Sequence, residues 1–476
     1  MKNKRLLTST LITLLMTACA NQPPAEEMAV ARNVILFVGD GMGVTTVTAA
    51  RIFEGQSLGL SGEEHSLTFE TFPNVALVKT YNTNQQVPDS AGTATAMMTG
   101  HKTRAGVINI GPQTNRRDCA GALADKLEPL SAIAKRRGKA AGFVTTTRVT
   151  HATPATVYAH SAERDWESDK YLRQSEQALG CRDIAHQLVN FDVGGGLDIA
   201  MGGGREEFYG QGGNRVSPDD DLVSEWLDGA PNRRFVATAN EMTAIEPGEQ
   251  VLGLFADSHM TYVAERGEAS TEPMLADMTA AAIRHLASDE DGYFLMVEGG
   301  RIDHGHHDGK PGYAMLETQA FADAVKVALE MVDLDETLIL VTADHSHVFT
   351  LGGYATRGNP ILGLVVENDK RGESQSKPAL DANGVPYTTL GYANGPGAID
   401  ELPRPHPDVG THAISQSLIS ILKVGIDGVQ SDSETHGGED VALYGTGVGA
   451  ERVRGVMEQN RIFDIMMNAY GWGAGD

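Results

Sequence analysis

Apolar residues occur along the chain in short continuous runs that alternate with stretches of helical pattern. Four runs have the length and composition of strands buried on both faces of a parallel sheet, at residues 33–38, 140–144, 293–297 and 337–341. Helical patterns accompany them, for example at 130–137, 273–286, 313–331 and 453–469. This alternation predicts the α/β class, with helices packed on a large and mostly parallel sheet.

The alternation fails from about residue 367 to residue 430. This stretch is rich in Gly, Pro, Asn, Asp and Ser, and its apolar runs are brief, such as 413–424. Such a composition is typical of a surface insertion. We therefore expect one α/β domain formed by 32–366 and 431–476, with residues 367–430 inserted and the fold resuming near Glu434.

Residues 1–18 have the organisation of an export signal. A basic start leads into an apolar run at 6–16, which is too short to span a bilayer, and small residues precede Cys19. The sequence Leu-Met-Thr-Ala-Cys ending at Cys19 resembles the bacterial lipobox, so we expect a lipidated Cys19, with simple secretion as the alternative. Residues 19–31 would form a short tether. We expect an exported protein, in the periplasm or on the outer membrane, whose only membrane contact is this anchor.

Charge and cysteine content narrow the class further. The formal net charge is −25, which argues against nucleic acid as a partner. Apart from Cys19 the chain has two cysteines, Cys119 and Cys181. In an oxidising compartment such a pair suggests one disulfide, and two unpaired buried thiols are the alternative.

The stretch 87–100, Val-Pro-Asp-Ser-Ala-Gly-Thr-Ala-Thr-Ala-Met-Met-Thr-Gly, predicts a closely packed helix. Asp89 or Ser90 would cap its start, and Gly100 would end it in a left-handed conformation. The Ser90 hydroxyl would then lie at a helix N-terminus, where free N–H groups favour an anion. An ordinary cap explains the local sequence equally well, because no neighbouring residue makes Ser90 reactive.

Three of the predicted strands are followed directly by carboxylates and imidazoles, at 39–43, 298–307 and 343–347. Ligands bind at the carboxyl ends of strands in open α/β sheets, so we expect these groups to share one edge. Asp, Glu and His without Cys suit zinc and magnesium. Taken singly, each segment could be a turn, a solvated loop or a structural histidine. Together they supply what Ser90 lacks, because two metals about 4 Å apart can ionise a hydroxyl and hold a phosphate.

Four motifs in the chain resemble those of the alkaline phosphatase family. They are Phe-Val-Gly-Asp-Gly-Met-Gly, Val-Pro-Asp-Ser-Ala-Gly-Thr-Ala-Thr-Ala, Val-Glu-Gly-Gly-Arg-Ile-Asp-His-Gly-His-His and Val-Thr-Ala-Asp-His-Ser-His-Val-Phe. The resemblance runs from about residue 33 to 469 and is closer to the animal than to the enteric bacterial branch. It implies a three-layer sandwich with a crown-like insertion, a homodimer, and hydrolysis of small phosphomonoesters of broad range.

The resemblance implies a role for each matched position. Ser90 corresponds to the serine that is phosphorylated and then hydrolysed, and Arg164 corresponds to the phosphate clamp. The other positions match metal ligands: Asp303, His307 and His436 for a first zinc; Asp40, Asp344 and His345 for a second zinc; and Asp40, Thr153 and Glu298 for a magnesium.

Further side chains are expected beside these ligands. The resemblance implies that His151 contacts the magnesium through water and that His304 reaches phosphate or a bound water. Asp89 is not a ligand in the family pattern, and we expect it to orient Arg164.

The resemblance also bears on the cysteines, the insertion and calcium. Cys119 and Cys181 correspond to a disulfide pair, and residues 367–430 resemble the crown domain at the dimer interface. Ala256 stands where a Glu ligand of the animal calcium site is expected. The implied calcium set is therefore weakened, and it consists of Glu225, the Phe255 carbonyl and Glu272.

Two other functions were weighed against phosphomonoester hydrolysis. A sulfatase or phosphodiesterase shares the architecture, but a sulfatase needs a Cys or Ser followed by x-Pro-x-Arg, and Ser90 is followed by Ala-Gly-Thr-Ala. A lipoprotein that binds metal or phosphate for uptake needs no serine beside two metals. Loss of aryl phosphate turnover on chelation and in Ser90→Ala separates these cases.

Overall fold

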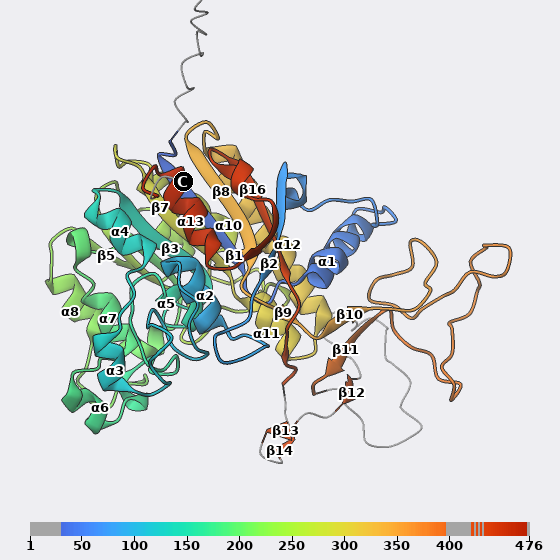
Figure 1. Cartoon of the computed structure of the whole chain (residues 1–476), viewed down its shortest axis with the longest axis horizontal. Coiled ribbons are helices and arrows are strands. Elements are labelled where there is room, and N and C mark those ends of the chain that lie inside the picture. Colours follow the sequence, from blue (N-terminus) through green and yellow to red (C-terminus); the bar gives the residue numbers. More distant parts are fainter. Residues whose placement is uncertain (1–29, 397–419, 423–424, 427–428, 431–432, 474–476) are drawn as a thin grey trace, which may run out of the picture.

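The computed structural model describes residues 30–396, 420–422, 425–426, 429–430 and 433–473 (Figure 1). The predicted export signal, Cys19, most of the tether and most of the apolar run 413–424 lie outside the described residues. No helix in the described part of the chain combines the length and the apolar character needed to cross a bilayer.

A ten-stranded sheet forms the centre of the molecule, in the order β17-β2-β16-β8-β1-β7-β3-β4-β6-β5. Only β16 runs antiparallel to its neighbours, β2 and β8. The central strands β8, β1 and β7 are buried almost throughout, as continuous apolar runs predict. The strands are β1 (Asn33–Gly39), β2 (Asn74–Lys79), β3 (Ala140–Arg148), β4 (Ile199–Gly203), β5 (Arg233–Val236), β6 (Gln250–Leu254), β7 (Tyr293–Gly299), β8 (Thr337–Ala343), β16 (Val441–Gly447) and β17 (Gly455–Glu458).

Helices cover both faces of the sheet, which confirms the predicted three-layer α/β architecture (Figure 1). One layer contains α1 (Val44–Ser57), α10 (Leu275–Leu286) and α12 (Pro311–Met331). The other contains α2 (Ser90–Thr99), α4 (Leu130–Arg136), α5 (Ala152–Ala155) and α13 (Arg461–Ala469). Shorter helices are α3 (Cys119–Ala124), α6 (Gln174–Leu179), α7 (Ile184–Val189), α8 (Leu222–Asp228), α9 (Ala239–Met242) and α11 (Arg301–His307).

Helix α2 has the predicted caps. The Asp89 carboxylate accepts a hydrogen bond from the Gly92 N–H at 3.1 Å, and Gly100 ends the helix with φ of 76°. Every residue of α2 is buried. A Cβ on Gly92 would lie 2.2 Å from the Asn82 amide, so the small residues of this helix permit its close packing.

The prediction of one helix over 453–469 is wrong. Residues Gly455–Glu458 form β17, an edge strand parallel to β2, and α13 begins only at Arg461. Gly455 has φ of 71°, which breaks a helix, and pairing with β2 gives the following residues main-chain partners. A long-range contact therefore overrides the local helical pattern.

Residues 352–389 project from the sheet as loops, drawn in orange in Figure 1. Isolated bridges such as Ala355 to Glu367 and Leu364 to Thr388 join them. The adjoining short strands are β9 (Ser346–His347), β10 (Phe349–Leu351), β11 (Leu390–Asn394), β12 (Ser420–Leu422), β13 (Gly425–Ile426), β14 (Val429–Gln430) and β15 (His436–Gly437). The boundaries of the insertion at 367–430 stay a prediction.

Candidate metal centre and active site

The register of the central strands brings three motifs to one edge of the sheet. In β1, Gly39 is opposite both Gly299 of β7 and Ala343 of β8. The segments after these strands therefore start at the same level. Asp40, Glu298 and Asp344 are all fully buried there.

The first predicted zinc set comes together from two segments. Asp303 and His307 lie one turn apart on α11, with His307 Nε2 3.3 Å from Asp303 Oδ1. Strand β15 pairs with β9 and brings in His436, whose Nε2 lies 3.5 Å from the same oxygen. The Nε2 atoms of His307 and His436 are 3.1 Å apart. Three potential ligand atoms thus converge on one point.

His347 also belongs to this cluster, and sequence reasoning missed it. Its Nε2 lies 2.8 Å from Asp303 Oδ1 and its Nδ1 lies 2.5 Å from Glu434 Oε2. Burial opposes a charge on this imidazole, but Glu434 and Asp303 outweigh it and raise the pKa of His347 to about 10. These contacts fit a residue that orients Asp303. The position of His347 two residues after His345 was visible in the sequence, but its contact with Glu434 was not.

The second predicted zinc set surrounds the Ser90 hydroxyl. His345 Nε2 lies 3.4 Å from both Asp40 Oδ1 and Asp344 Oδ2. Ser90 Oγ lies 3.1 Å from the same imidazole nitrogen and 3.5 Å from Asp40 Oδ1. Ser90 is only 2% exposed. Its hydroxyl therefore lies among groups that favour a cation.

Two of the predicted magnesium residues, Asp40 and Glu298, lie close together with His151. Oxygens of Asp40 and Glu298 and a ring nitrogen of His151 lie within 4.8 Å of one another. Glu298 Oε2 accepts hydrogen bonds from Thr145 and Thr147, whereas its Oε1 has no partner. The Thr153 hydroxyl is likewise buried without a partner among the described residues.

The electrostatics of the second zinc set and of the magnesium set favour a bound positive charge. Burial and the neighbouring Asp344 raise the pKa of Asp40 well above its usual value, and burial raises the pKa of Glu298 to about 7. Asp40 Oδ2 and Asp344 Oδ2 are buried without a hydrogen-bond partner. Buried carboxylates with unused oxygens are costly unless they bind a cation, so the residues present fit bound divalent metals.

The predicted phosphate clamp is held from two sides. Arg164 Nη1 lies 3.3 Å from Asp89 Oδ2, and its Nη2 lies 3.2 Å from His151 Nε2. The Asp89 carboxylate also accepts from the main-chain N–H groups of Gly92 and Gly106, at 3.1 and 2.8 Å. Asp89 thus caps α2 and contacts Arg164 with one side chain, as expected for a residue that orients the guanidinium.

Two residues near His304 were also missed. The His304 imidazole has its Nδ1 2.7 Å from Arg301 Nη1, and its ring lies 4.3 Å from that of His259. Burial lowers the pKa of His304 to about 3, which keeps it neutral. Arg301 falls inside a quoted motif, but His259 belongs to no motif, and only the folded chain brings it to this place.

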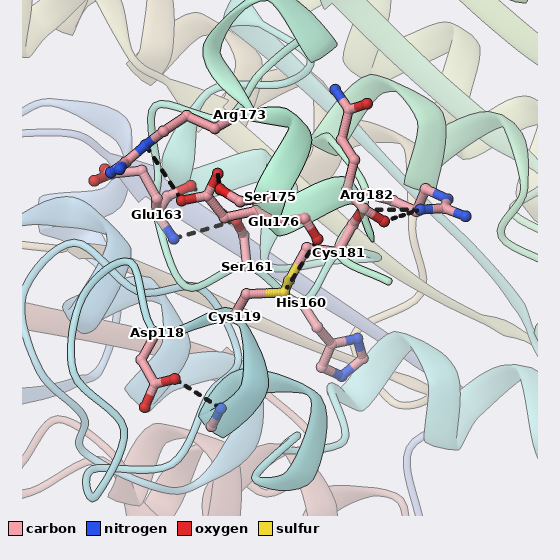
Figure 2. Close-up of a disulfide and its surroundings, with 12 residues drawn as sticks. Asp118, Cys119, His160, Ser161, Glu163, Arg173, Ser175, Glu176, Cys181 and Arg182 are labelled. Atoms are coloured by element: carbon pink, nitrogen blue, oxygen red, sulfur yellow. Dashed lines mark hydrogen bonds and ion pairs between the residues drawn. A yellow bond between two sulfur atoms is a disulfide. The ribbon is translucent and has the colours of Figure 1, made fainter. Parts of the chain in front are cut away.

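A disulfide joins Cys119 to Cys181, with the two Cα atoms 6.0 Å apart (Figure 2). The sequence left open either a disulfide or two unpaired thiols, and the structure contains the disulfide. Among the residues of the weakened calcium set, Glu272 is bonded to Thr261 and paired with Arg266. In the described part of the chain neither Glu272 nor Glu225 belongs to a cluster of three potential metal ligands.

Comparisons with known proteins agree with this geometry. The family model described as alkaline phosphatase matches residues 31–472. The chain belongs to the alkaline phosphatase family. The tissue-nonspecific alkaline phosphatase of Rattus norvegicus is 41% identical over 470 residues, covering 94% of this chain and 84% of the relative. The membrane-bound alkaline phosphatase of Bombyx mori is 40% identical over 448 residues, covering 91% of this chain and 78% of that protein.

Solved alkaline phosphatases share the fold. The enzyme from the Antarctic bacterium TAB5 superposes with a TM-score of 0.63 at 23% identity, covering 94% of this chain and all of that one. The expected likeness to the animal branch is confirmed by the animal alkaline phosphatases among the relatives. The chain is therefore a phosphomonoesterase with metal-binding groups at the carboxyl edge of its sheet.

Proposed function

We propose that this alkaline phosphatase hydrolyses phosphomonoesters through a covalent phosphoserine on Ser90, with two zinc ions and one magnesium ion per chain. The observation that carries the proposal is the arrangement around Ser90. Its hydroxyl lies within 3.5 Å of Asp40 and His345, beside carboxylate oxygens that have no partner of their own.

Three sets of side chains would hold the metals. They are Asp303, His307 and His436 for the first zinc; Asp40, Asp344 and His345 for the second; and Asp40, Thr153 and Glu298 for magnesium, with His151 beside it. When bound, the ions supply the positive charge that lowers the pKa of the serine hydroxyl and of the attacking water and stabilises the leaving oxygen.

The side chains of this chain would carry the reaction in two displacements. Ser90 Oγ attacks phosphorus in line; the Oγ–P bond forms as the bond to the leaving alkoxide breaks, and the alcohol departs with a proton. Water then attacks phosphorus, the Oγ–P bond breaks, and Ser90 regains its proton as inorganic phosphate leaves. Arg164 grips two phosphate oxygens throughout, and His304 reaches phosphate or a bound water.

Magnesium has support from a relative of the same fold. A TAB5 alkaline phosphatase variant with one histidine changed to aspartate is described with Mg bound in its M3 site. In this chain the carboxylates of Asp40 and Glu298 lie beside His151. We assign magnesium to this set because hard carboxylate and hydroxyl oxygens are the ligands it prefers.

The proposal also covers the localisation, membrane anchoring and assembly of the enzyme. We infer an exported protein, anchored through a lipidated Cys19 after removal of residues 1–18, with 19–31 as a tether. Residues 367–430 would form a crown-like insertion at a homodimer interface, beside a catalytic domain of 32–366 and 431–476. Because Ala256 replaces an expected Glu ligand, we include no calcium ion in this proposal.

Acid-quench labelling tests the nucleophile. With 4-nitrophenyl phosphate as substrate we expect turnover, and with labelled inorganic phosphate at acidic pH we expect label on the peptide that contains Ser90. Ser90→Ala should lose both, whereas Ser57→Ala, at the exposed end of α1, should lose neither. Full turnover by Ser90→Ala would overturn the phosphoserine mechanism, and metal analysis that finds zinc in only one set would overturn the two-zinc scheme.

A further inference from the structure

A cavity of about 510 Å³ opens on the surface away from the proposed catalytic groups. Three segments form its wall: residues 126–136 before and on α4, residues 158–160 after α5, and residues 182–193 on and around α7. No residue proposed to bind metal or phosphate lines it. Its volume is in the range of small-molecule binding sites.

The floor of this cavity is apolar and partly aromatic. Pro129, Ala132 and Tyr158 are buried, and Leu127 and Phe191 are half-buried beside them. The Tyr158 hydroxyl donates to a main-chain carbonyl at 2.9 Å, so its polar end is already satisfied. Aromatic and aliphatic side chains therefore make up this part of the lining.

The rim carries positive charge on an otherwise acidic protein. Arg136 is neutralised by Glu128, and one further acid, Asp192, lines the cavity. Lys126 and Arg182 form no ion pair with any described residue, and the Arg182 guanidinium donates only to main-chain carbonyl oxygens, at 3.0 and 3.4 Å. Two cations without acidic partners at one cavity attract an anion, in a chain of net charge −25.

Hydrogen bonds hold the three walls together. The Gln187 side chain accepts from His160 N–H at 2.9 Å and donates to the carbonyl oxygens of His160 and Arg182, at 3.1 and 3.0 Å. His160 Nε2 donates to the carbonyl of Leu127 at 2.9 Å. Figure 2 shows His160 and Arg182 beside the disulfide at Cys181. Because the walls are fixed in advance, a ligand loses little free energy to ordering them.

The imidazole of His160 adds no charge to the cavity. Burial lowers the pKa of His160 to about 4, so the ring is neutral at pH 7. Its Nε2 carries the proton, because that nitrogen faces a carbonyl oxygen, and its Nδ1 is left as an acceptor. The positive character of the rim therefore comes from Lys126 and Arg182.

We propose that this cavity is a second ligand site that binds a small organic anion with a planar apolar ring, the ring on the Tyr158 and Phe191 floor and the anionic group at Lys126 and Arg182. The proposal goes beyond phosphomonoester hydrolysis and does not depend on it. A matched pair of fluorescent probes tests both halves of the ligand: 1-anilinonaphthalene-8-sulfonate, and N-phenyl-1-naphthylamine, which has the same rings without the sulfonate.

We expect saturable binding of the sulfonate to the full-length enzyme, about tenfold tighter than that of the neutral amine. Arg182→Gln should weaken sulfonate binding about tenfold and leave amine binding unchanged, whereas Arg454→Gln, an exposed charge outside the cavity, should change neither by more than about twofold. Saturating inorganic phosphate should not displace the sulfonate, because the catalytic groups lie elsewhere.

Filling the cavity gives the second test. Ala132→Trp should abolish sulfonate binding while melting temperature and 4-nitrophenyl phosphate turnover stay unchanged. Leu127→Trp, at a half-buried position, replaces it if Ala132→Trp does not fold. The proposal is overturned if the sulfonate does not bind, if the two probes bind equally well, if phosphate displaces the sulfonate, or if folded cavity-filling variants still bind it.

Discussion

Two clusters of charged side chains in this protein, one built around an arginine and the other from carboxylates and histidines, differ in whether their own residues satisfy their polar atoms. Around Arg215, whose side chain is 5% exposed, three carboxylates converge: Asp183 at 3.2 Å, Asp220 at 3.3 Å and Asp169 at 3.7 Å. None of these four side chains has a buried polar atom without a partner among the described residues. That cluster is complete within the chain, and its role is structural.

The cluster at the carboxyl ends of β1, β7 and β8 is incomplete by the same measure. Within the part of the chain that the structure describes, Asp40, Asp344, Glu298 and Thr153 each have one buried oxygen without a hydrogen-bond partner. Like charges also lie close together there: after burial, the neighbouring Asp344 contributes most to raising the pKa of Asp40, whereas burial raises the pKa of Asp344 against a hydrogen bond from the Gly41 N–H. A buried charged cluster therefore indicates a ligand site when its own residues cannot satisfy it. Four experiments test this distinction, in order of expected effect.

Metal removal should have the largest effect, and only on the incomplete cluster. Chelation should lower 4-nitrophenyl phosphate turnover by about 10³-fold or more, because several kcal/mol of charge stabilisation are lost. It should also reduce the free energy of unfolding by about 4 kcal/mol, as expected for ions bound far above their dissociation constants. Metal analysis, turnover and urea unfolding before and after zinc and magnesium are restored provide the measurement. Full turnover by metal-free protein would contradict the assignment.

Breaking the complete cluster should affect stability and spare catalysis. Arg215→Met leaves the buried Asp183 and the partly buried Asp169 and Asp220 without their cation, and should reduce the free energy of unfolding by about 3 kcal/mol. The matched control is Arg371→Met, because the Arg371 side chain is 85% exposed and its ion pair with Asp369 should contribute at most about 1 kcal/mol. Turnover per folded molecule should be unchanged in both. If Arg215→Met and Arg371→Met reduced the free energy of unfolding equally, the Arg215 cluster would contribute no more to stability than an exposed ion pair.

Glu317 is an intermediate case, a buried carboxylate away from the metal sets. Burial raises its pKa to about 7, with the Val263 N–H and Arg266 opposing the shift. Between about pH 4.5 and 7 the folded state then binds more protons than the unfolded state, so this group's stability contribution is full below that window and is lost as pH rises through it. Glu317→Gln removes this loss.

The difference in the free energy of unfolding between Glu317→Gln and wild type should shift in favour of the variant by on the order of 2–3 kcal/mol when the pH is raised from 5 to 8. Urea unfolding of the two proteins at both pH values measures it. Glu330→Gln, an exposed change on the same helix, should show no such gain. A difference between Glu317→Gln and wild type that does not vary with pH would contradict the shifted pKa.

Substitution of Asp89 should give the smallest effect, because both of its carboxylate oxygens already have hydrogen-bond donors within the chain. Asp89→Asn keeps an acceptor for the α2 cap but loses the charge that faces Arg164 at 3.3 Å. We expect inorganic phosphate to bind about tenfold more weakly, with a smaller change in kcat. Inhibition by phosphate and the kcat for an aryl phosphate separate the two. A pure rate loss with unchanged phosphate affinity would mean that Asp89 does not act through Arg164.

Much of the scaffold could be predicted because the relevant signals are local. The apolar runs that became β1, β3, β7 and β8 are continuous, and the caps of α2 are encoded next to the helix itself. The helix predicted over 453–469 failed because β17 forms only by pairing with β2, far away in the sequence.

The candidate site shows the same division. Its carboxylates could be predicted to share an edge, because each directly follows a buried strand. His347 and His259 could not, because their partners come from other segments: Glu434 for the first, and Arg148 and His304 for the second. Ser90 itself has only the local signature of a helix cap, and the reactivity that we propose for it depends on neighbours that only the folded chain assembles.

The order of strands in the sheet also determines when, during synthesis of the chain, the active site can assemble. The N–H of Gly41 donates to the Asp344 carboxylate, 303 residues later, and His436 Nδ1 donates to the Pro88 carbonyl oxygen, 348 residues earlier in the loop before α2. Closing such large loops is slow, because chain entropy is lost before the contacts that offset it can form. Ser90, the proposed nucleophile, thus leaves the ribosome long before the residues that surround it in the folded protein. If the proposed function holds, the first zinc set can bind its metal only after the chain has been synthesised as far as His436. A chain that ends earlier contains Ser90 but lacks part of the metal site that would ionise its hydroxyl.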